Sequence, residues 1–186
     1  MTIICHYNSL HPRTYAALIR HSYIWKIGYV DTSGSETAYW ESIASMWNMG
    51  SDLVLIEQDI EIHGGVFPEF HQCPESWCVF PYSLGAAVRE TAHIQEVSSD
   101  GSMTVVQPPP GCIYGNGCTR YAVAAQRLVT PAQIQEETSS QWGWGNWRDL
   151  DSKLSAALLR RGLTPHIHQP NVEHWRGDTP LLFLQL

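Results

Sequence analysis

The chain has 186 residues, of which 44% are hydrophobic, and it carries a formal net charge of -7 at pH 7. This length suits one globular domain, residues 1–186, with a substantial core. The negative charge excludes a general electrostatic attraction to nucleic acid, although it allows a local basic patch. The sequence has no apolar run near twenty residues and no secretion signal, so we expect a soluble, cytoplasmic protein without a membrane segment.

Strand and helix patterns alternate through the first third of the chain. Short apolar segments at 2–5, 24–30 and 53–56 predict strands. A helix is expected from Pro12 to about residue 20, and another between Ser35 and Gly50. The order β-α-β-α-β is typical of an α/β fold, here a single Rossmann-like domain with a mostly parallel central sheet flanked by helices.

Polar residues follow each of the first two predicted strands. His6 and Asn8 lie in the loop after the first strand, and Asp31 follows the second. Ligands bind at the carboxyl ends of strands in open α/β sheets, so these residues are candidates for contacts to a nucleotide. Ordinary turn and cap roles are the alternative. The sequence has no Gly-x-Gly-x-x-Gly and no phosphate-loop lysine motif, which argues against a dinucleotide oxidoreductase and an ordinary kinase.

Two acids follow the third predicted strand, residues 53–56, whose apolar side chains indicate burial on both faces of a parallel sheet. Glu57 and Asp59 are two residues apart, and carboxylates with this spacing can face one divalent cation. The alternative is a solvated strand end.

The middle of the chain is less regular. Residues 63–68 are expected to form a loop, and 83–111 a variable insertion around one hairpin that joins 93–97 to 103–107. Residues 119–123 are expected to run into a helix, and Pro131 to start a short one.

A tryptophan- and glycine-rich segment precedes another acidic helix start. Trp142, Trp144 and Trp147 offer flat rings of the kind that line sugar and base sites, or else contribute to an aromatic core. Asp149 and Asp151 follow them, where a carboxylate gains from the positive end of the helix dipole. A functional carboxylate beside a tryptophan wall is the other interpretation.

Further candidate metal ligands lie in the tail and among the cysteines. The tail has three histidines within nine residues, His166, His168 and His174. They could provide a metal ligand, and the alternative is that they are ordinary surface histidines. The odd number of cysteines indicates reduced thiols. A zinc site formed by Cys73, Cys78, Cys112 and Cys118 is conceivable, although the spacing between them is loose for a zinc ribbon. The cysteines are Cys5, Cys73, Cys78, Cys112 and Cys118.

Together these motifs resemble glycosyltransferases of the GT-A type, particularly small proteins of that type found in phage and actinobacterial sequences. The strand 53–56 followed by Glu57-Gln58-Asp59 is similar to the Asp-x-Asp element of that family, with Glu in first place. The segment 142–145, leading to an acidic helix that ends at Arg161-Gly162, is similar to the acceptor loop and catalytic-base helix of inverting galactosyltransferases.

This resemblance implies roles for the residues above. Asp59, with His174 or His168, would hold Mn²⁺ or Mg²⁺, and Glu57 would contact the sugar or ribose, or the metal through water. Asp151 is the preferred catalytic base and Asp149 the alternative. Residues 1–61 would bind the nucleotide sugar, and residues 62–186 would bind the acceptor. The expected donor is a UDP-sugar such as UDP-glucose.

The expected reaction is inverting transfer of a hexose to an acceptor hydroxyl. The phage proteins suggest the hydroxymethyl group of 5-hydroxymethylcytosine in DNA, whereas the acidic net charge fits a carbohydrate or protein acceptor equally well. A zinc hydrolase that uses the three tail histidines, and a non-catalytic binding module that uses the tryptophans, are alternatives from other classes. The oligomeric state is not predicted. The basic residues expected near the acceptor are Arg120, Arg148, Lys153, Arg160, Arg161 and Arg176.

Overall fold

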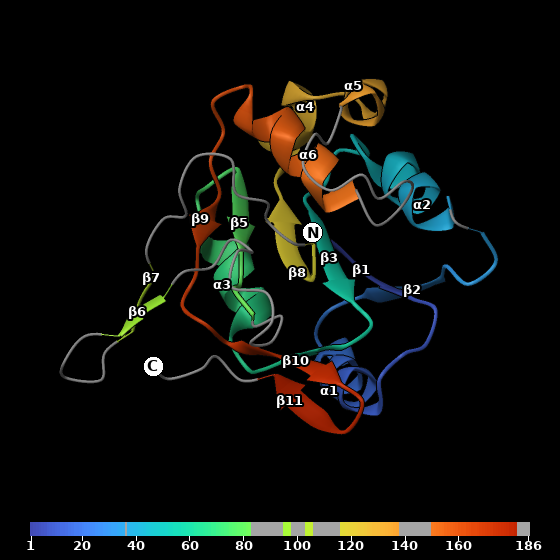
Figure 1. Cartoon of the computed structure of the whole chain (residues 1–186), viewed down its shortest axis with the longest axis vertical. Coiled ribbons are helices and arrows are strands. Elements are labelled where there is room, and N and C mark those ends of the chain that lie inside the picture. The colour runs from blue at the N-terminus through green and yellow to red at the C-terminus, as the bar shows by residue number, and fades with distance from the viewer. Residues whose placement is uncertain (36, 83–94, 98–102, 106–115, 138–149, 182–186) are drawn as a thin grey trace.

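The protein is represented by a computed structural model that describes residues 1–35, 37–82, 95–97, 103–105, 116–137 and 150–181. Its centre is a six-stranded sheet in the order β2-β1-β3-β8-β5-β9. Helices cover both faces of this sheet (Figure 1). The α/β fold expected from the sequence is therefore confirmed.

The N-terminal part of the chain has the predicted β-α-β-α-β order. β1 pairs in parallel with both β2 and β3, so the carboxyl ends of the three strands lie at one edge of the sheet. The elements are β1 (Thr2–Tyr7), α1 (Pro12–Ser22), β2 (Ile27–Asp31), α2 (Ala38–Met46) and β3 (Leu53–Glu57).

The rest of the chain completes the sheet in mixed orientation. β8 runs antiparallel to β3 and β5, and β9 runs parallel to β5, so the sheet is mostly parallel. The elements are β4 (Ile60–Ile62), α3 (Val66–Gln72), β5 (Trp77–Val79), β8 (Cys118–Tyr121), α4 (Val123–Leu128), α5 (Pro131–Glu136), α6 (Leu150–Leu159) and β9 (His166–Ile167).

Two smaller sheets accompany the central one. β10 (Val172–Arg176) lies between β4 and β11 (Thr179–Leu181), with antiparallel pairing on both sides. β6 (Gln95–Val97) and β7 (Met103–Val105) form an antiparallel hairpin, which confirms the hairpin predicted there.

Several local predictions were wrong. Residues 63–68 are not all loop, because α3 begins at Val66, with Pro68 in its first turn, where a proline is tolerated. Residues 119–123 do run into a helix, α4, as expected, but residues 118–121 form a strand that was not predicted, and all four are buried in the sheet. The helix expected to be capped by Ser35 begins after Thr37, and Ser35 Oγ instead accepts a hydrogen bond from the Thr37 backbone N–H at 3.1 Å.

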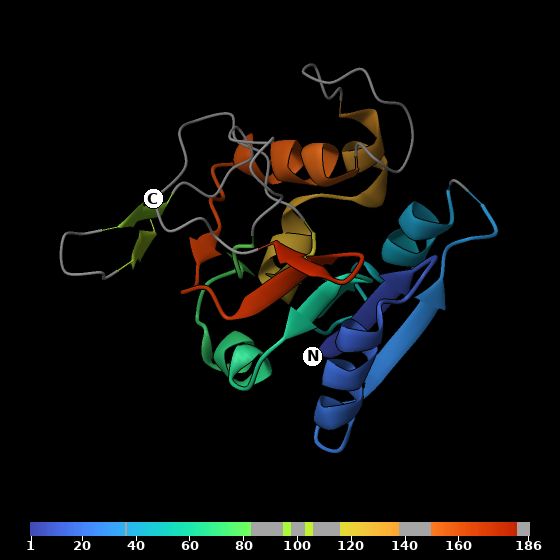
Figure 2. The same cartoon turned by 60° about the horizontal axis from the view of Figure 1, so that its bottom comes forward.

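Alternating side chains of β3 enter two hydrophobic cores, as expected for a strand buried on both faces. Leu53 and Leu55 pack with residues of α2, α4, α5 and α6 on one face. Val54 and Ile56 pack with residues of α1 and α3 on the other (Figure 2). The strand on which both cores depend therefore carries Glu57 to a fixed place at the sheet edge. Among the described residues, no helix is long and apolar enough to cross a membrane.

Candidate active site

A cleft of about 380 Å³ lies at the carboxyl ends of β1, β2 and β3. Strand register explains why its residues meet, because Glu57 lies beside His6 and Asp31 beside Tyr7 in the parallel ladders. His6, Asn8, Glu57 and Asp59, which are candidate ligand contacts from the sequence, all line this cleft. The lining residues are His6, Tyr7, Asn8, Thr32, Ser33, Ser35, Tyr39, Glu57, Gln58 and Asp59.

Gln58 fastens the first loop of the cleft to the end of β3. Its Oε1 accepts hydrogen bonds from the backbone N–H groups of Asn8, at 2.8 Å, and Ser9, at 3.0 Å. The backbone carbonyl of Gln58 accepts another from the N–H of His11 at 2.9 Å. Sequence analysis gave Gln58 no role, and its position between two acids at a strand end was the only available signal.

His6 forms a neutral part of the wall. Its Nε2 lies 2.9 Å from Ser42 Oγ, and its ring meets that of Tyr39 edge-on with centroids 4.5 Å apart. Burial lowers the pKa of His6 to about 4, so the imidazole carries no charge at neutral pH. It can therefore contact a ligand without adding positive charge.

Asp31 lies next to the lining residues of the β2 loop. Its Oδ1 accepts a hydrogen bond from the backbone N–H of Ser33 at 2.8 Å. Hydrogen bonding from Ser33 lowers the pKa of Asp31, which is exposed and therefore ionised at neutral pH. The residue both shapes the turn and presents a carboxylate beside the cleft.

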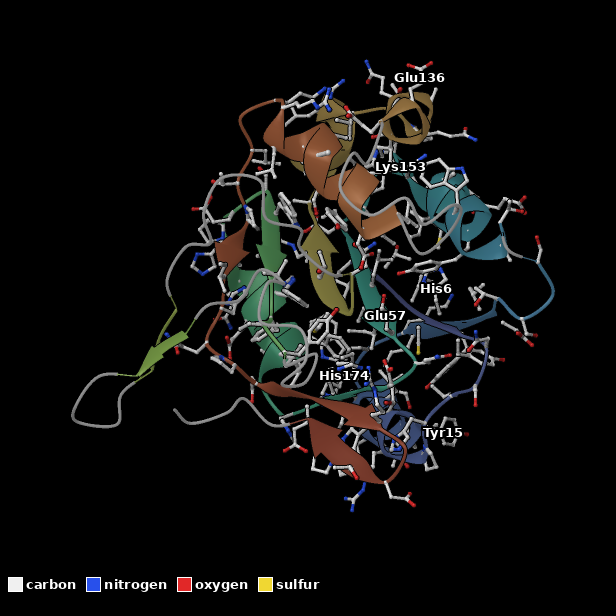
Figure 3. The ribbon with its side chains drawn as sticks, viewed as in Figure 1. His6, Tyr15, Glu57, Glu136, Lys153 and His174 are labelled. Atoms are coloured by element: carbon white, nitrogen blue, oxygen red, sulfur yellow. The ribbon has the colours of Figure 1, made fainter. Side chains whose placement is uncertain are left out.

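Asp59 and His174 are brought together from distant parts of the sequence. Asp59 Oδ2 lies 3.1 Å from His174 Nε2, and the Trp175 backbone N–H donates to the Asp59 carbonyl at 2.8 Å. β10 carries His174 to this place by pairing with β4, where His174 lies opposite Ile60. Figure 3 labels His174, Glu57 and His6 in this part of the molecule.

The Asp59 and His174 side chains fit a divalent cation. Cis ligands of an octahedral ion with bonds of about 2.1 Å are roughly 3.0 Å apart, close to the separation observed here. A carboxylate oxygen suits Mg²⁺ and Mn²⁺, and an imidazole nitrogen favours a transition metal such as Mn²⁺ over Mg²⁺.

Glu57 and Asp151 form a coupled pair of carboxyl groups. Burial raises the pKa of Glu57 well above its usual value, and the nearby charges of Asp151 and Asp59 raise it further. Burial also raises the pKa of Asp151 to about 7, and the neighbouring Asn116 opposes this shift. Asp151 lies in the first turn of α6, so this helix brings the carboxyl to the end of β3. Both carboxyl groups therefore keep their protons to higher pH than exposed carboxyls do.

Tyrosine rings surround this pair. The hydroxyl of Tyr39 donates to Glu57 Oε1 at 3.4 Å, and that of Tyr121 donates to Asn116 Oδ1 at 2.6 Å. Burial raises the pKa values of Tyr39 and Tyr121, and the charges of Glu57 and Asp151 raise them further. The tyrosines therefore remain protonated donors.

The ring of Tyr82 and the turn at Gly117 also lie near this pair of carboxyl groups. The hydroxyl of Tyr82 accepts from the Gly117 backbone N–H at 3.3 Å, and its ring lies edge-on to His174 with centroids 5.5 Å apart. Sequence analysis missed all three tyrosines and Asn116.

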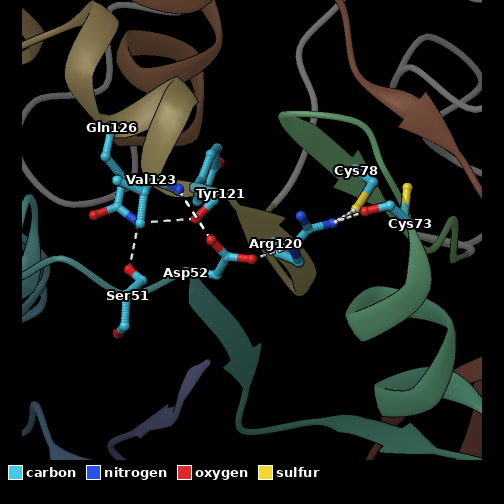
Figure 4. Close-up of polar contacts among 8 residues, drawn as sticks. All are labelled: Ser51, Asp52, Cys73, Cys78, Arg120, Tyr121, Val123 and Gln126. Atoms are coloured by element: carbon cyan, nitrogen blue, oxygen red, sulfur yellow. Dashed lines mark hydrogen bonds and ion pairs between the residues drawn. The ribbon is translucent and has the colours of Figure 1, made fainter.

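Arg120, expected near the acceptor, lies at the other end of β3. Antiparallel pairing places it opposite Val54, and its Nε lies 3.0 Å from Asp52 Oδ2 in an ion pair with an almost fully buried guanidinium (Figure 4). Its Nη1 also donates to the Cys73 carbonyl at 3.1 Å and to Cys78 Sγ at 3.3 Å. These bonds give Arg120 a structural place away from the cleft.

The tail histidines separate into two places. His168 Nδ1 lies 3.4 Å from Glu69 Oε2, and its ring stacks on Phe80 with centroids 4.5 Å apart, whereas His174 lies beside Asp59. The zinc-hydrolase alternative required these histidines in one cluster, and the described residues do not form it. Trp142, Trp144, Trp147 and Asp149 lie outside the described residues, as does Cys112.

No protein-family model and no curated protein matches the sequence. Solved structures do have similar folds. A197 from STIV matches with a TM-score of 0.51 and 8% identity, over 95% of this chain and 86% of that one. At this identity the similarity indicates a shared fold and says nothing about activity.

Two further solved structures match with lower TM-scores. A glycosyltransferase involved in the glycosylation of the major capsid of PBCV-1 has a TM-score of 0.49 and 8% identity, over 96% of this chain and 93% of that one. A putative glucose-1-phosphate thymidylyltransferase from Bacillus anthracis has a TM-score of 0.46 and 15% identity, over 92% and 70%.

Proposed function

We propose that the protein is a metal-dependent glycosyltransferase that moves a hexose from a nucleotide sugar to an acceptor hydroxyl. The observation that carries this proposal is the 3.1 Å approach of Asp59 Oδ2 to His174 Nε2 at a cleft that also contains Glu57. A carboxylate and an imidazole with this spacing suit a cation that binds a diphosphate.

The nucleotide part of the donor would occupy the ends of β1 and β2. Thr32, Ser33 and Ser35 line this side with hydroxyl groups, and Asn8 adds an amide. The Asp31 carboxylate stands beside them and can accept a hydrogen bond from a ribose hydroxyl. A UDP-sugar is the donor to test first.

The diphosphate would lie against Asp59 and His174. Mn²⁺ bound by these two residues would supply charge neutralisation for the departing nucleoside diphosphate. The hydrogen-bond contact between these two side chains involves the same two atoms, so the bound cation would replace it. The neutral His6 ring, which also lines the cleft, adds no positive charge to it.

Asp151 would act as the general base. The acceptor oxygen attacks the anomeric carbon and passes its proton to Asp151, while the bond from that carbon to the diphosphate oxygen breaks with its electron pair leaving on the diphosphate. Attack opposite the leaving group inverts the anomeric centre. Glu57 lines the cleft, where its carboxyl group can form a hydrogen bond with a sugar hydroxyl.

The acceptor proposed for the first test is the hydroxymethyl group of 5-hydroxymethylcytosine in DNA. The net charge of -7 and the buried ion pair of Arg120 reduce the basic surface available for DNA. Arg160 likewise pairs with Glu137 at 3.2 Å. A carbohydrate or protein hydroxyl is therefore the second acceptor class to test.

A transfer assay distinguishes these acceptors. The protein is incubated with UDP-glucose, Mn²⁺ and DNA that contains 5-hydroxymethylcytosine, and the nucleosides are analysed by mass spectrometry after digestion. A hexose adduct that Asp151→Asn abolishes and Asp178→Asn retains is expected, since Asp178 is exposed in the turn between β10 and β11. Hydrolysis of the donor without an adduct would redirect the search to carbohydrate acceptors, and equal transfer by Asp151→Asn would refute the assigned base.

A further inference from the structure

A cluster of soft metal ligands lies outside the cleft. Cys73, Cys78 and His168 each offer one ligand atom, and these atoms lie within 4.8 Å of one another. Cys73 follows the end of α3, Cys78 is the central residue of β5, and His168 follows β9. Three separate elements therefore converge on one point, and we propose that these residues bind a thiophilic divalent cation, Zn²⁺ by preference.

The orientation of His168 supports this assignment. Its Nδ1 lies 3.4 Å from Glu69 Oε2, which suits an N–H donated to the carboxylate. Its Nε2 is buried and has no hydrogen-bond partner among the described residues. A carboxylate that fixes one imidazole nitrogen and leaves the other as ligand is the usual arrangement around a zinc-bound histidine.

The identity of the ligands selects the metal. Two thiolates with an imidazole suit Zn²⁺, whereas Mg²⁺ and Mn²⁺ prefer oxygen ligands. Tetrahedral Zn²⁺ with bonds of ~2.3 Å holds two sulfurs about 3.8 Å apart, so the two sulfurs, which lie within 4.8 Å of one another, have to approach by at most about 1 Å. Cys73 is only partly buried and has room for that adjustment. Water is the fourth ligand in this assignment.

The charges of the site balance. Binding releases one proton from each thiol, and the two thiolates neutralise the dication. Arg120 donates to Cys78 Sγ at 3.3 Å, and its charge is in turn balanced by Asp52 at 3.0 Å (Figure 4). The metal therefore adds no unpaired charge to the interior.

The cation would fasten the last strand of the sheet. β9 has only two residues and lies at the edge of the described sheet, where β5 is its one partner among the strands that the structure describes. Its continuation is held by the bond from the His168 backbone N–H to the Val79 carbonyl at 2.9 Å. A metal bound to Cys78 and His168 adds a side-chain link between the same two strands, and Cys73 ties them to α3.

Cobalt titration tests the site directly. The protein is reduced, stripped with a chelator and titrated with Co²⁺, which gives a near-ultraviolet charge-transfer band only when thiolate binds it. We expect one equivalent of Co²⁺ to produce this band and Zn²⁺ to abolish it. Cys73→Ser and His168→Gln should each lose most of the band, and Glu69→Gln should weaken binding by about 10- to 100-fold.

Matched variants separate this site from the cleft. Cys5→Ser changes another buried thiol and should keep the band. Asp59→Asn, in the cleft, should also keep it. No thiolate band in the reduced, folded wild type would overturn the proposal, and so would a band that persists at full intensity in Cys73→Ser and His168→Gln.

Discussion

The acidity of Asp151 suits the general-base role proposed for it. Burial raises its pKa to about 7. A base whose pKa lies near the operating pH combines a large deprotonated fraction with useful basicity. Burial and the Asp151 charge also raise the pKa of the neighbouring Glu57, so the two carboxyls oppose one another's ionisation.

The pH dependence of catalysis follows from this pair. Asp151 must be deprotonated to accept the acceptor proton, so kcat/KM should fall about tenfold for each pH unit below about 7. Asp151→Asn should lower kcat by about 10²- to 10⁴-fold and remove this acidic limb. Initial rates from pH 5 to 9 measure both effects, and a wild-type profile that is flat across this range would exclude Asp151 as the base.

The same residue should make the fold less stable as the pH rises. The native pKa of about 7 exceeds the ordinary value of 3.8 that applies to the unfolded chain. The native state therefore binds more protons between about pH 4 and 7, and stability decreases across this window. Asparagine cannot ionise, so the melting temperature of Asp151→Asn minus that of wild type should increase from pH 4 to 7.

Asp178→Asn is the control for this measurement, because Asp178 is exposed in a turn. Its difference in melting temperature from wild type should change little over the same range. A constant difference for Asp151→Asn as well would mean that the Asp151 pKa is not raised in the folded protein.

At the scale of elements, the turn at Asn116 and Gly117 joins β8 to the carboxyl pair. The Gly117 carbonyl accepts from the Glu57 backbone N–H at 3.0 Å, and its N–H donates to Tyr82. A Cβ atom at Gly117 would lie 2.5 Å from the Tyr82 ring. The turn can pass so close to the ring only because residue 117 has no side chain.

Gly117→Ala should therefore displace the Tyr82 ring and destabilise the fold by about 1–3 kcal/mol. Gly34→Ala is the matched control, because a Cβ there meets nothing within 4 Å, and its effect should stay within about 0.5 kcal/mol. Denaturant unfolding of both variants gives the comparison. Equal free energies of unfolding for the two variants would show that the Tyr82 ring can move without loss of stability.

The sequence predicted elements well where local signals were strong. Pro12 starts α1, Pro131 starts α5 with a capping box from Thr130, and the apolar run at 53–56 lies within β3. β8 and the strands after residue 165 were missed, because short strands paired across long sequence separations leave little periodicity.

The site was predictable to a similar extent. Asp59 and His174 were expected to approach one another on the strength of a family resemblance, and they do. Arg120 could not be placed from the sequence, because only the antiparallel register of β8 sends it to the opposite end of β3. The tyrosines around Glu57 were hidden for the same reason, since their convergence depends on tertiary packing.

At the scale of the whole molecule, the cleft and the buried Arg120 ion pair lie toward opposite ends of the central strands. The cleft lies at the carboxyl ends of β1, β2 and β3, whereas Arg120 and Asp52 lie toward the amino end of β3. The cysteine and histidine cluster connects to that second region through Cys78. The two proposed ligand sets, a carboxylate with an imidazole and two thiols with an imidazole, thereby lie apart, which would let two different metals bind without exchange.

The central claim is that Asp59 and His174 hold a cation for a nucleotide sugar in the cleft. Thermal unfolding with UDP-glucose, with Mn²⁺, and with both tests it most directly, because a ligand of the native state raises the melting temperature by mass action. Wild type and Asp178→Asn should be stabilised by UDP-glucose much more strongly when Mn²⁺ is present, and Asp59→Asn and His174→Gln should lose this dependence. Stabilisation of Asp59→Asn and His174→Gln equal to that of wild type, or none of wild type by any nucleotide sugar, would contradict the claim.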